Sequence, residues 1–520
     1  MRRNLYSTFL AGALLFSLAS CASDTAAPPS SPVSASSSGE NASSLYDGSR
    51  QLILSDNGVT LDGKEPDTNT VTVTNDIVYY HDGTDDSYGE GTEADMHTAK
   101  ESDAHTVVTI REAGTYLVSG QLSAGQLAID LGEDAKRDPQ AVVTLVLDGV
   151  DITCTVAPAV IFYNVYECDE AWVAYDEEET EDYVSSPLVD TSAAGANVIL
   201  ADGSVNQVTG SYVARIYKEG TTKKLHKYDG AFYSKMSMNI DGEAEGTGVL
   251  TIIADNEGLD SELHLTVNGG SISIQAQNDG INTNEDNVSV TTINGGTLQI
   301  NAGLGKEGDG IDSNGHIVIN GGAIYSIASD HSADGGLDAD GDILINGGHV
   351  AALGVRNDIV SADSNQLYIE MSFASLLPAG SKVELEGTSL SFTLEKAAQS
   401  IIYSAPELKR DTSYTLKVDG VVQQYTGNSS GGFPGGAGGG FPPDDLPEGE
   451  FKPDQRPEGG FQPPEDGEFQ QPPEDGQQPP TDRPERPEGG WRGGESAGEP
   501  SQDFTLTDDI HAFSGITAQE

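Results

Sequence analysis

The sequence predicts an all-β protein: a parallel β-helix (solenoid) closed by a C-terminal β cap and followed by a disordered Gly/Pro-rich tail. The first observation is a repeat, because Asn-Gly-Gly occurs at 268–270, 294–296, 320–322 and 346–348, in steps of 26 residues. The second is the alternation of apolar and polar residues between these turns, which sends alternate side chains to one face of a strand. Short strands and tight turns at this period are typical of stacked coils.

The first residues predict a lipoprotein signal peptide. Arg2 and Arg3 precede an apolar stretch, Phe9 to Leu18, that is too short to span a bilayer. This stretch ends in Leu-Ala-Ser-Cys, which resembles a bacterial lipobox and implies that Cys21 carries the lipid; a chance cysteine after an ordinary signal peptide is the alternative. We therefore expect an extracytoplasmic protein at the cell surface, held to the bacterial cell membrane or outer membrane by its lipid anchor only.

Changes in composition divide the chain. The segment after the lipobox is rich in Ser, Ala and Pro, the 26-residue period is lost after 365, and Gly, Pro, Gln, Asp and Glu dominate near the C-terminus. An apolar stretch, Phe504 to Ile516, could dock back on the body as a strand. The expected segments are a signal peptide (1–20), a flexible tether (21–48), the parallel β-helix (49–365), the β cap (366–427), the disordered tail (428–502) and the C-terminal segment (503–520).

The charge excludes several partners. With 83 Asp and Glu against 26 Lys and Arg, the formal net charge is −57. Such a chain repels phosphate groups, so we expect neither a nucleic-acid nor a nucleotide partner. Beyond Cys21, the chain has only Cys154 and Cys168. In an oxidising compartment these two could form a disulfide, and two buried free thiols are the equal alternative.

A second repeated element lies opposite the Asn-Gly-Gly turns. It reads acid-Gly-aliphatic-Asp/Asn-small at 257–261, 279–283 and 309–313, and the copy at 335–339 begins with Gly in place of the acid. Because stacked coils are about 4.8 Å apart, equivalent positions should form columns of carboxylates along one edge. We interpret the Asn-Gly-Gly sites as turns only, with Asn268, Asn294, Asn320 and Asn346 stacked as a side-chain ladder.

A column of carboxylates needs counter-charge. Residues 256–342 contain fourteen Asp and Glu but only one base, Lys306. Like charges about 5 Å apart repel by about 1 kcal/mol in water and by more when partly buried. Calcium, which takes 6–8 oxygen ligands, would relieve this repulsion, and the glycine beside each acid would let a backbone carbonyl join the ligands. The alternative is that these Asp-Gly pairs are only turns. The predicted calcium ligands are Glu257, Asp260, Asp279, Asn282, Asp309, Asp312, Asp330, Asp334, Asp338, Asp340 and Asp342. The last five of these, from Asp330 to Asp342, form the densest group.

At these residues the chain resembles a family of bacterial surface lipoproteins described as carbohydrate-binding domain-containing proteins. The resemblance rests on Ala113 to Gly120, Leu147 to Thr153, Asp229-Gly230-Ala231, the Asp-Gly and Asn-Gly-Gly coils, and the Gly/Pro-rich tail closed by Phe513-Ser514-Gly515. It covers about 49 to 427 continuously and extends loosely to the end. It implies a right-handed parallel β-helix, similar to that of pectate lyases, that binds calcium and acidic, pectate-like polysaccharide, with cellulose also described. The chain departs from the pattern in the insertion at 169–195 and at Gly335.

Three functions remain open, and we favour a non-enzymatic binder of acidic polysaccharide acting through calcium. A polysaccharide lyase would need a base beside the carboxylates, and only Lys306 and Arg356 are placed for it, although Arg356 could simply pair with Asp358. The third function is a structural rod or adhesin. Four aromatic residues are candidates for stacking on sugar rings, unless they belong to the core: Tyr228, Phe232, Tyr233 and Tyr325.

Overall fold

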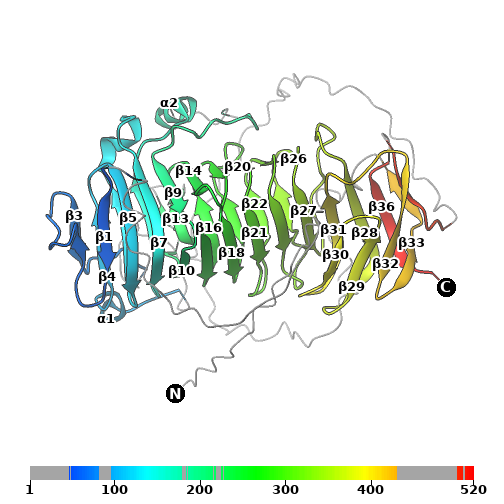
Figure 1. The fold of residues 1–520 in the computed structure, drawn as a ribbon, viewed down its shortest axis with the longest axis horizontal. Helices are drawn as coiled ribbons and strands as arrows, with labels where there is room; N and C mark the ends of the chain where they lie inside the picture. The colour runs from blue at the N-terminus through cyan, green and yellow to red at the C-terminus, as the bar shows by residue number, and fades with distance from the viewer. Residues whose placement is uncertain are drawn as a thin grey trace, which may run out of the picture. The chain divides into compact units, whose positions relative to one another are not determined.

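A computed structural model describes residues 46, 48–80, 95–178, 183, 186–214, 216–217, 224–226, 228–429, 500–507 and 510–519. All of them belong to one compact unit, Met1–Phe433 together with Glu499–Glu520. The predicted signal peptide, Cys21, most of the tether and most of the Gly/Pro-rich tail lie outside the described residues. The described body is mostly β, with many parallel strands in large sheets, an arrangement consistent with a β-helix (Figure 1).

Three stacks of parallel strands make up most of this body, and each strand pairs with its equivalent in the next coil. Stack 1 consists of β5 (Gly114–Leu122), β7 (Val143–Thr153), β9 (Ala196–Leu200), β14 (Met238–Gly242), β17 (Leu265–Val267), β20 (Val290–Ile293), β23 (His316–Ile319) and β26 (Ile343–Ile345). Stack 2 consists of the end of β7, β10 (Val205–Gly210), β15 (Val249–Ala254), β18 (Ser271–Ala276), β21 (Thr297–Asn301), β24 (Ala323–Ile327) and β27 (His349–Gly354). Stack 3 consists of β4 (Thr106–Ile110), β6 (Gly125–Asp130), β8 (Val160–Asn164), β13 (Gly230–Ser234), β16 (Glu257–Ser261), β19 (Ile281–Thr283), β22 (Ile311–Ser313) and β25 (Leu337–Ala339).

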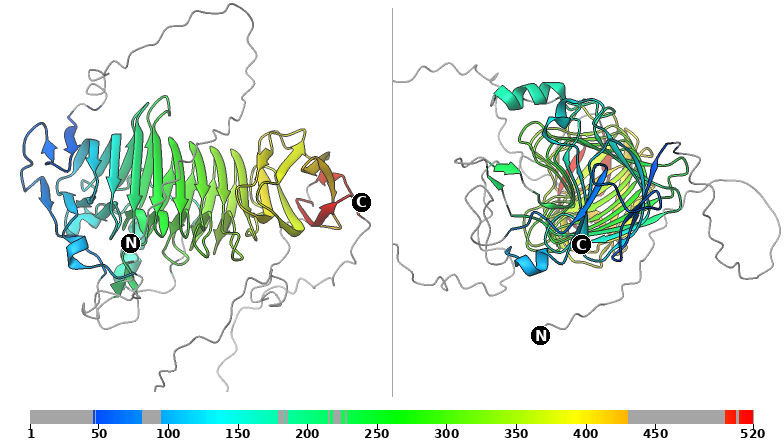
Figure 2. Two further views of the ribbon diagram at one scale, coloured as in Figure 1. Left: turned by 90° about the horizontal axis from the view of Figure 1, so that it is seen from below. Right: turned by 90° about the vertical axis from the view of Figure 1, so that its left-hand side faces the viewer.

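The alternation predicted from the sequence sets the register of these stacks. Leu250, Ile272 and Leu298 are in register on β15, β18 and β21, and all three side chains are at most 1 % exposed. A shift by one residue would turn this whole row to solvent, so burial of the row specifies the pairing. Each such side chain contributes about 1.5–3 kcal/mol when it is fully buried. In the right-hand view of Figure 2 the coils are seen one behind another around this interior.

The Asn-Gly-Gly turns join stack 1 to stack 2, and their asparagines form the expected ladder. The side-chain Nδ2 of Asn294 donates to Oδ1 of Asn268, at 2.8 Å, and Asn320 donates to Asn294 in the same way, at 2.8 Å. Asn346 and then Asn365 continue the ladder, at 2.9 and 2.7 Å. The second glycine of each turn has a positive φ of 84–92°, a conformation that only glycine adopts without strain.

The predicted cap is a mostly antiparallel β module, in which only β28 and β36 pair in parallel among its described strands. Its strand β31 pairs antiparallel with β27, the last parallel strand of stack 2, and so covers an edge that would otherwise be open to aggregation. The expectation that the C-terminal segment docks as a strand is confirmed, because β36 pairs with β28. The cap strands are β28 (Tyr368–Leu377), β29 (Lys382–Glu386), β30 (Ser391–Thr393), β31 (Ala398–Ser404), β32 (Thr412–Val418), β33 (Val421–Gln424), β34 (Gly427–Ser429), β35 (Phe504–Leu506) and β36 (Ala512–Ala518).

Shorter elements complete the described chain. At the N-terminal end, β1 pairs in parallel with β5 and antiparallel with β2, and β3 pairs antiparallel with β4. The helix α2 lies in the insertion at 169–195. No helix in the described part of the chain is long and apolar enough to cross a membrane. These elements are β1 (Arg50–Leu54), β2 (Thr60–Leu61), β3 (Val71–Thr74), β11 (Ile216–Tyr217), β12 (Lys224–His226), α1 (Ala99–Ser102), α2 (Glu170–Glu178) and the 3₁₀ helix η2 (Glu133–Arg137).

Candidate functional site

Two acidic columns run along stack 3, at the positions that the repeated Asp-Gly element predicts. The entry column, at the start of β16 and two residues before β19 and β22, contains Glu257, Asp279 and Asp309. The strand column, three residues further on, contains Asp260, Asn282, Asp312 and Asp338, which are in direct register on β16, β19, β22 and β25. The sequence therefore predicted the members of both columns correctly, because parallel in-register pairing places equivalent residues above one another.

Backbone amides of each following coil bind the entry column. The N–H of Asp309 donates to Oδ1 of Asp279, and the N–H of Gly335 donates to Oδ1 of Asp309, both at 2.6 Å. The column ends at Gly335, where glycine replaces the acid, as the sequence indicated. These donors favour the charged carboxylates, but they are opposed by burial and by the neighbouring acids.

Burial and the neighbouring acids outweigh these hydrogen bonds, so the columns contain carboxyl groups with raised pKa values. Burial, followed by repulsion from Asp279 and Asp338, raises the pKa of Asp309 to about 9. Burial, followed by the charges of Asp358 and Asp312, raises the pKa of Asp338 to about 7. Burial and then Glu257 raise the pKa of Asp279 well above its usual value. Perturbed titratable groups gathered in one place are characteristic of functional sites.

The strand column also contains an amide oxygen that lacks a partner. Asn282 is only 5 % exposed, and its Nδ2 donates to Oδ1 of Asn284 at 3.2 Å, whereas its own Oδ1 is buried without a hydrogen bond. Leaving such an acceptor unsatisfied costs about 1–3 kcal/mol. A cation between coils would satisfy it, and carboxylate and amide oxygens are the ligands that calcium prefers. The chemistry of the donors thus fits calcium.

The geometry differs from the predicted ligand set in two respects. Among the described residues, no three Asp, Glu, His or Cys side chains converge as they would on a metal ion. The predicted dense group of five acids is also divided, because each contacts a different part of the fold. Asp330 accepts from the N–H of Ala397 in the cap, Asp334 accepts from the N–H of Gly308, Asp338 belongs to the strand column, and Asp340 and Asp342 are exposed.

The glycine of the Asp-Gly element has a role other than the one predicted. Gly258, Gly280 and Gly310 do not have positive φ, so they are not needed to turn the backbone. A Cβ on Gly280 would lie 2.2 Å from Cγ2 of Ile300 and 2.6 Å from the carbonyl oxygen of Gly310. Glycine is required because two coils approach closely here.

The structure rejects three of the four predicted sugar-stacking residues. Phe232 and Tyr233 are completely buried and Tyr228 is 7 % exposed, so their rings belong to the core. The Tyr233 hydroxyl donates to Oε1 of Glu262 at 2.7 Å. Tyr325 differs, because it is partly exposed and lines a pocket between stack 2 and the cap. The sequence could not separate the four, since aromatic residues serve both core and surface.

The basic residues near the columns include one that the sequence analysis missed. Lys306 is exposed, and Arg356 pairs with Asp358 at 3.3 Å, as considered above. Lys396, from the cap loop between β30 and β31, donates its Nζ to the carbonyl of Ala302 and lies near the charges of Asp330 and Asp334. Burial lowers the pKa of Lys396 to about 8. Its sequence position, 54 residues after Asp342, the last acid of the predicted ligand set, carries no signal of this proximity.

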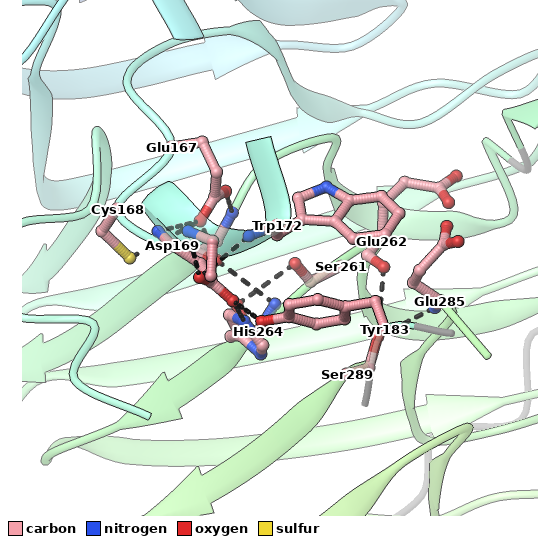
Figure 3. Close-up of polar contacts among 12 residues, drawn as sticks. Glu167, Cys168, Asp169, Trp172, Tyr183, Ser261, Glu262, His264, Glu285 and Ser289 are labelled. Carbon is pink, nitrogen blue, oxygen red and sulfur yellow. Dashed lines mark hydrogen bonds and ion pairs between the residues drawn. The ribbon is translucent and has the colours of Figure 1, made fainter. Parts of the chain in front are cut away.

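The insertion at 169–195 is fixed to the coils by a buried polar cluster (Figure 3). Asp169 accepts from the backbone N–H groups of Ala171 and Trp172 at the start of α2. Its other oxygen accepts from the Tyr183 hydroxyl, at 2.5 Å, and lies 3.3 Å from Nε2 of the fully buried His264. These contacts dock the described part of the insertion against the coils.

The two cysteines of the body are free thiols, so the candidate disulfide is wrong. Cys154 is buried in the core, and burial raises the pKa of its thiol to about 11. Cys168 lies on the insertion, with its Sγ 3.6 Å from Oε1 of Glu167. Burial and the adjacent carboxylate raise the pKa of Cys168 as well, so neither thiol is reactive as a thiolate.

The comparisons with known proteins agree with a carbohydrate-binding architecture. The family model described as "Carbohydrate-binding domain-containing protein" matches residues 104–187 and 169–409, which together are more than half of the chain. The chain belongs to this family. A relative of the same description from Acetivibrio thermocellus is 29 % identical over 170 residues, which are 32 % of this chain and 45 % of the relative. The chain thus spans less than half the length of that relative.

A solved structure is also similar to this member of the carbohydrate-binding domain family. It is described as a polysaccharide lyase-like protein from C. thermocellum, gadolinium derivative. The match has a TM-score of 0.32 and 21 % sequence identity, and it covers 58 % of this chain and 92 % of that chain.

Proposed function

We propose that this protein binds acidic, pectate-like polysaccharide through calcium ions held along the two acidic columns of a right-handed parallel β-helix. Membership of the carbohydrate-binding domain family supports a carbohydrate as the ligand. The observation that carries the mechanism is the pair of columns, which contain buried carboxyl groups of raised pKa and, within the strand column, the unsatisfied Oδ1 of Asn282.

The columns supply oxygen ligands where the chain supplies little positive charge. Asp279 and Asp309 of the entry column, and Asn282, Asp312 and Asp338 of the strand column, are the residues that would hold calcium. Bound calcium would provide open coordination positions for uronate carboxylates. Asp312 and Asp338 are partly exposed, whereas Asp260 is completely buried, so this C-terminal half of the strand column is the part accessible to a polymer.

Charge makes the proposed binding conditional on the cation. A chain with a formal net charge of −57 and an anionic glycan repel each other, and that repulsion is removed only where a cation lies between them. The proposal includes the predicted location, in which lipid on Cys21 holds the body at the cell surface and exposes the columns to extracellular polymer. Cys21 lies outside the described residues, and labelling of the chain with a fatty-acid probe, with Cys21→Ala as control, tests this point.

The test of binding is native electrophoresis of the chain without its signal peptide through a gel containing polygalacturonate, with calcium or with a chelator. We expect retardation only with calcium, and its loss in a variant that combines Asp309→Asn, Asp312→Asn and Asp338→Asn. Asp363→Asn, an exposed acid away from the columns, is the matched control. Retardation that is the same in chelator, or unchanged in the triple variant, would refute the calcium mechanism.

A second candidate function, a calcium-dependent polysaccharide lyase, is favoured by Lys396. A general base operates best when its pKa is near the ambient pH, and burial lowers the pKa of Lys396 to about 8 beside Asp330 and Asp334. Lys396 therefore replaces Lys306 and Arg356 as the best-placed base. The test is whether the unmodified chain releases unsaturated products from polygalacturonate and Lys396→Ala does not; that result would establish the lyase. Binding without product would favour the non-enzymatic binder. If neither binding nor product were observed, the structural rod or adhesin would be the remaining function.

A further inference from the structure

A pocket lies between stack 2 and the cap, away from the acidic columns. Strands β21, β24 and β27 contribute Gln299, Tyr325 and His349 to its wall, and the cap contributes Phe392 from β30 and Glu395 from the loop that follows. Residues more than 90 positions apart in the sequence meet here, because the cap folds back over the last coils.

The floor of the pocket is aromatic. The rings of Tyr325 and Phe392 meet edge to face, with centroids 5.7 Å apart and planes at 75°. Phe392 is 7 % exposed and is held in the core of the cap, whereas Tyr325 is partly exposed. A rigid aromatic pair of this kind presents an apolar surface that the C–H face of a pyranose ring can cover.

Polar groups around this floor have unused hydrogen-bonding capacity. The Tyr325 hydroxyl is buried near the backbone of Glu395 but makes no hydrogen bond of normal geometry. Oδ1 of Asn301, two residues after Gln299 on the same strand, is also buried without a partner, and its Nδ2 is 3.4 Å from Oε2 of Glu395. An aromatic floor surrounded by a few polar groups is the composition of a small-ligand site.

The charge around the pocket selects against an anionic ligand. Glu395 is exposed at the rim, and Oε2 of Glu407 lies 3.9 Å from Nδ1 of His349. Although burial opposes ionisation, hydrogen bonds from Ser389 and Tyr403 hold the pKa of Glu407 at about 2, so this carboxylate is charged at neutral pH. A uronate carboxylate would be repelled here, whereas a hydroxyl group of an uncharged sugar can donate to Glu395, which lines the pocket.

We infer that this pocket is a second carbohydrate-binding site, which takes one uncharged pyranose residue by stacking on Tyr325 and by hydrogen bonds to Gln299 and Glu395, without calcium. It is separate from the calcium-dependent binding of acidic polymer proposed above. Together the two sites would let the protein engage a mixed wall polysaccharide at both charged and neutral units.

The test is isothermal titration of the chain without its signal peptide, in excess chelator, with hexasaccharides of β-1,4-linked glucose, xylose and mannose. We expect at least one of them to bind, with at least a tenfold loss of affinity in Tyr325→Ala and in Gln299→Ala. Tyr325→Phe should keep part of the affinity, because it retains the ring. Gln299 is exposed, so its substitution does not threaten folding.

The surface variant Asp363→Asn, at an exposed residue outside both the pocket and the acidic columns, is the matched control and should bind the neutral hexasaccharide as the unmodified chain does. Absence of binding for all three probes would overturn the inference, as would equal affinity of Gln299→Ala and the unmodified chain. Failure of the calcium proposal alone would appear only with polygalacturonate, so the two results are distinguishable.

Discussion

We predict that the acidic columns make the calcium-free protein less stable at neutral pH than a variant in which one carboxyl group is removed. Asp309 is the clearest case, because its pKa rises to about 9 in the folded state from an ordinary value of 3.8. A raised pKa means that the folded state favours the protonated group. Its contribution to stability is therefore fully present below pH 3.8 and is lost progressively as the pH rises toward about 9.

The size of this loss follows from the shift. Each pH unit between the two pKa values removes about 1.4 kcal/mol of the free energy of unfolding, so the loss is about 1.5 kcal/mol at pH 5 and about 4 kcal/mol at pH 7. Asp309→Asn keeps the acceptor for the N–H of Gly335 but cannot ionise. In chelator, we therefore expect the stability of the variant relative to the unmodified chain to rise by about 3 kcal/mol between pH 5 and pH 7.

The assay is denaturant unfolding monitored by circular dichroism at both pH values, with chelator and with calcium. Calcium should stabilise the unmodified chain more than the variant, because the variant has lost one carboxylate ligand. Asp363→Asn, an exposed residue, should show neither effect. If the relative stability of Asp309→Asn did not change between pH 5 and pH 7 in chelator, the argument from buried carboxyl groups would be wrong.

Three further predictions concern stability and can be checked by thermal unfolding. Asn294→Ala removes two rungs of the asparagine ladder and should cost about 1–2 kcal/mol; an unchanged melting temperature would show that the ladder adds nothing. Gly280→Ala places a methyl group 2.2 Å from Cγ2 of Ile300 and should cost about 3 kcal/mol, more than Gly246→Ala, where nothing lies within 4 Å and only the positive φ opposes the change. Phe504→Ala should cost about 3–5 kcal/mol, because this completely buried ring ties the C-terminal segment to the cap; a smaller loss than for Gly246→Ala would contradict that role.

Local pattern was sufficient to predict the coils and the columns. A side chain's face alternates along a strand and equivalent residues stack across parallel strands, so the 26-residue repeat alone placed Asn294 in a ladder and Asp312 in register with Asp338. The docking of the C-terminal strand was also predictable, since an apolar stretch after a polar tail has to be buried somewhere.

Long-range packing decided what local pattern could not. Tyr233 and Tyr325 are both tyrosines of the repeat region, yet one is inside the core and the other lines the pocket, because only the tertiary structure determines which face the cap leaves open. Lys396 reaches the acids of the coils, and Cys154 and Cys168 remain apart, through contacts between segments far apart in the sequence. The sequence by itself determined the repeat and its register, because these are periodic and local; the tertiary structure decided which acids, bases and aromatic rings meet, because those contacts depend on how the cap and the insertion fold over the coils.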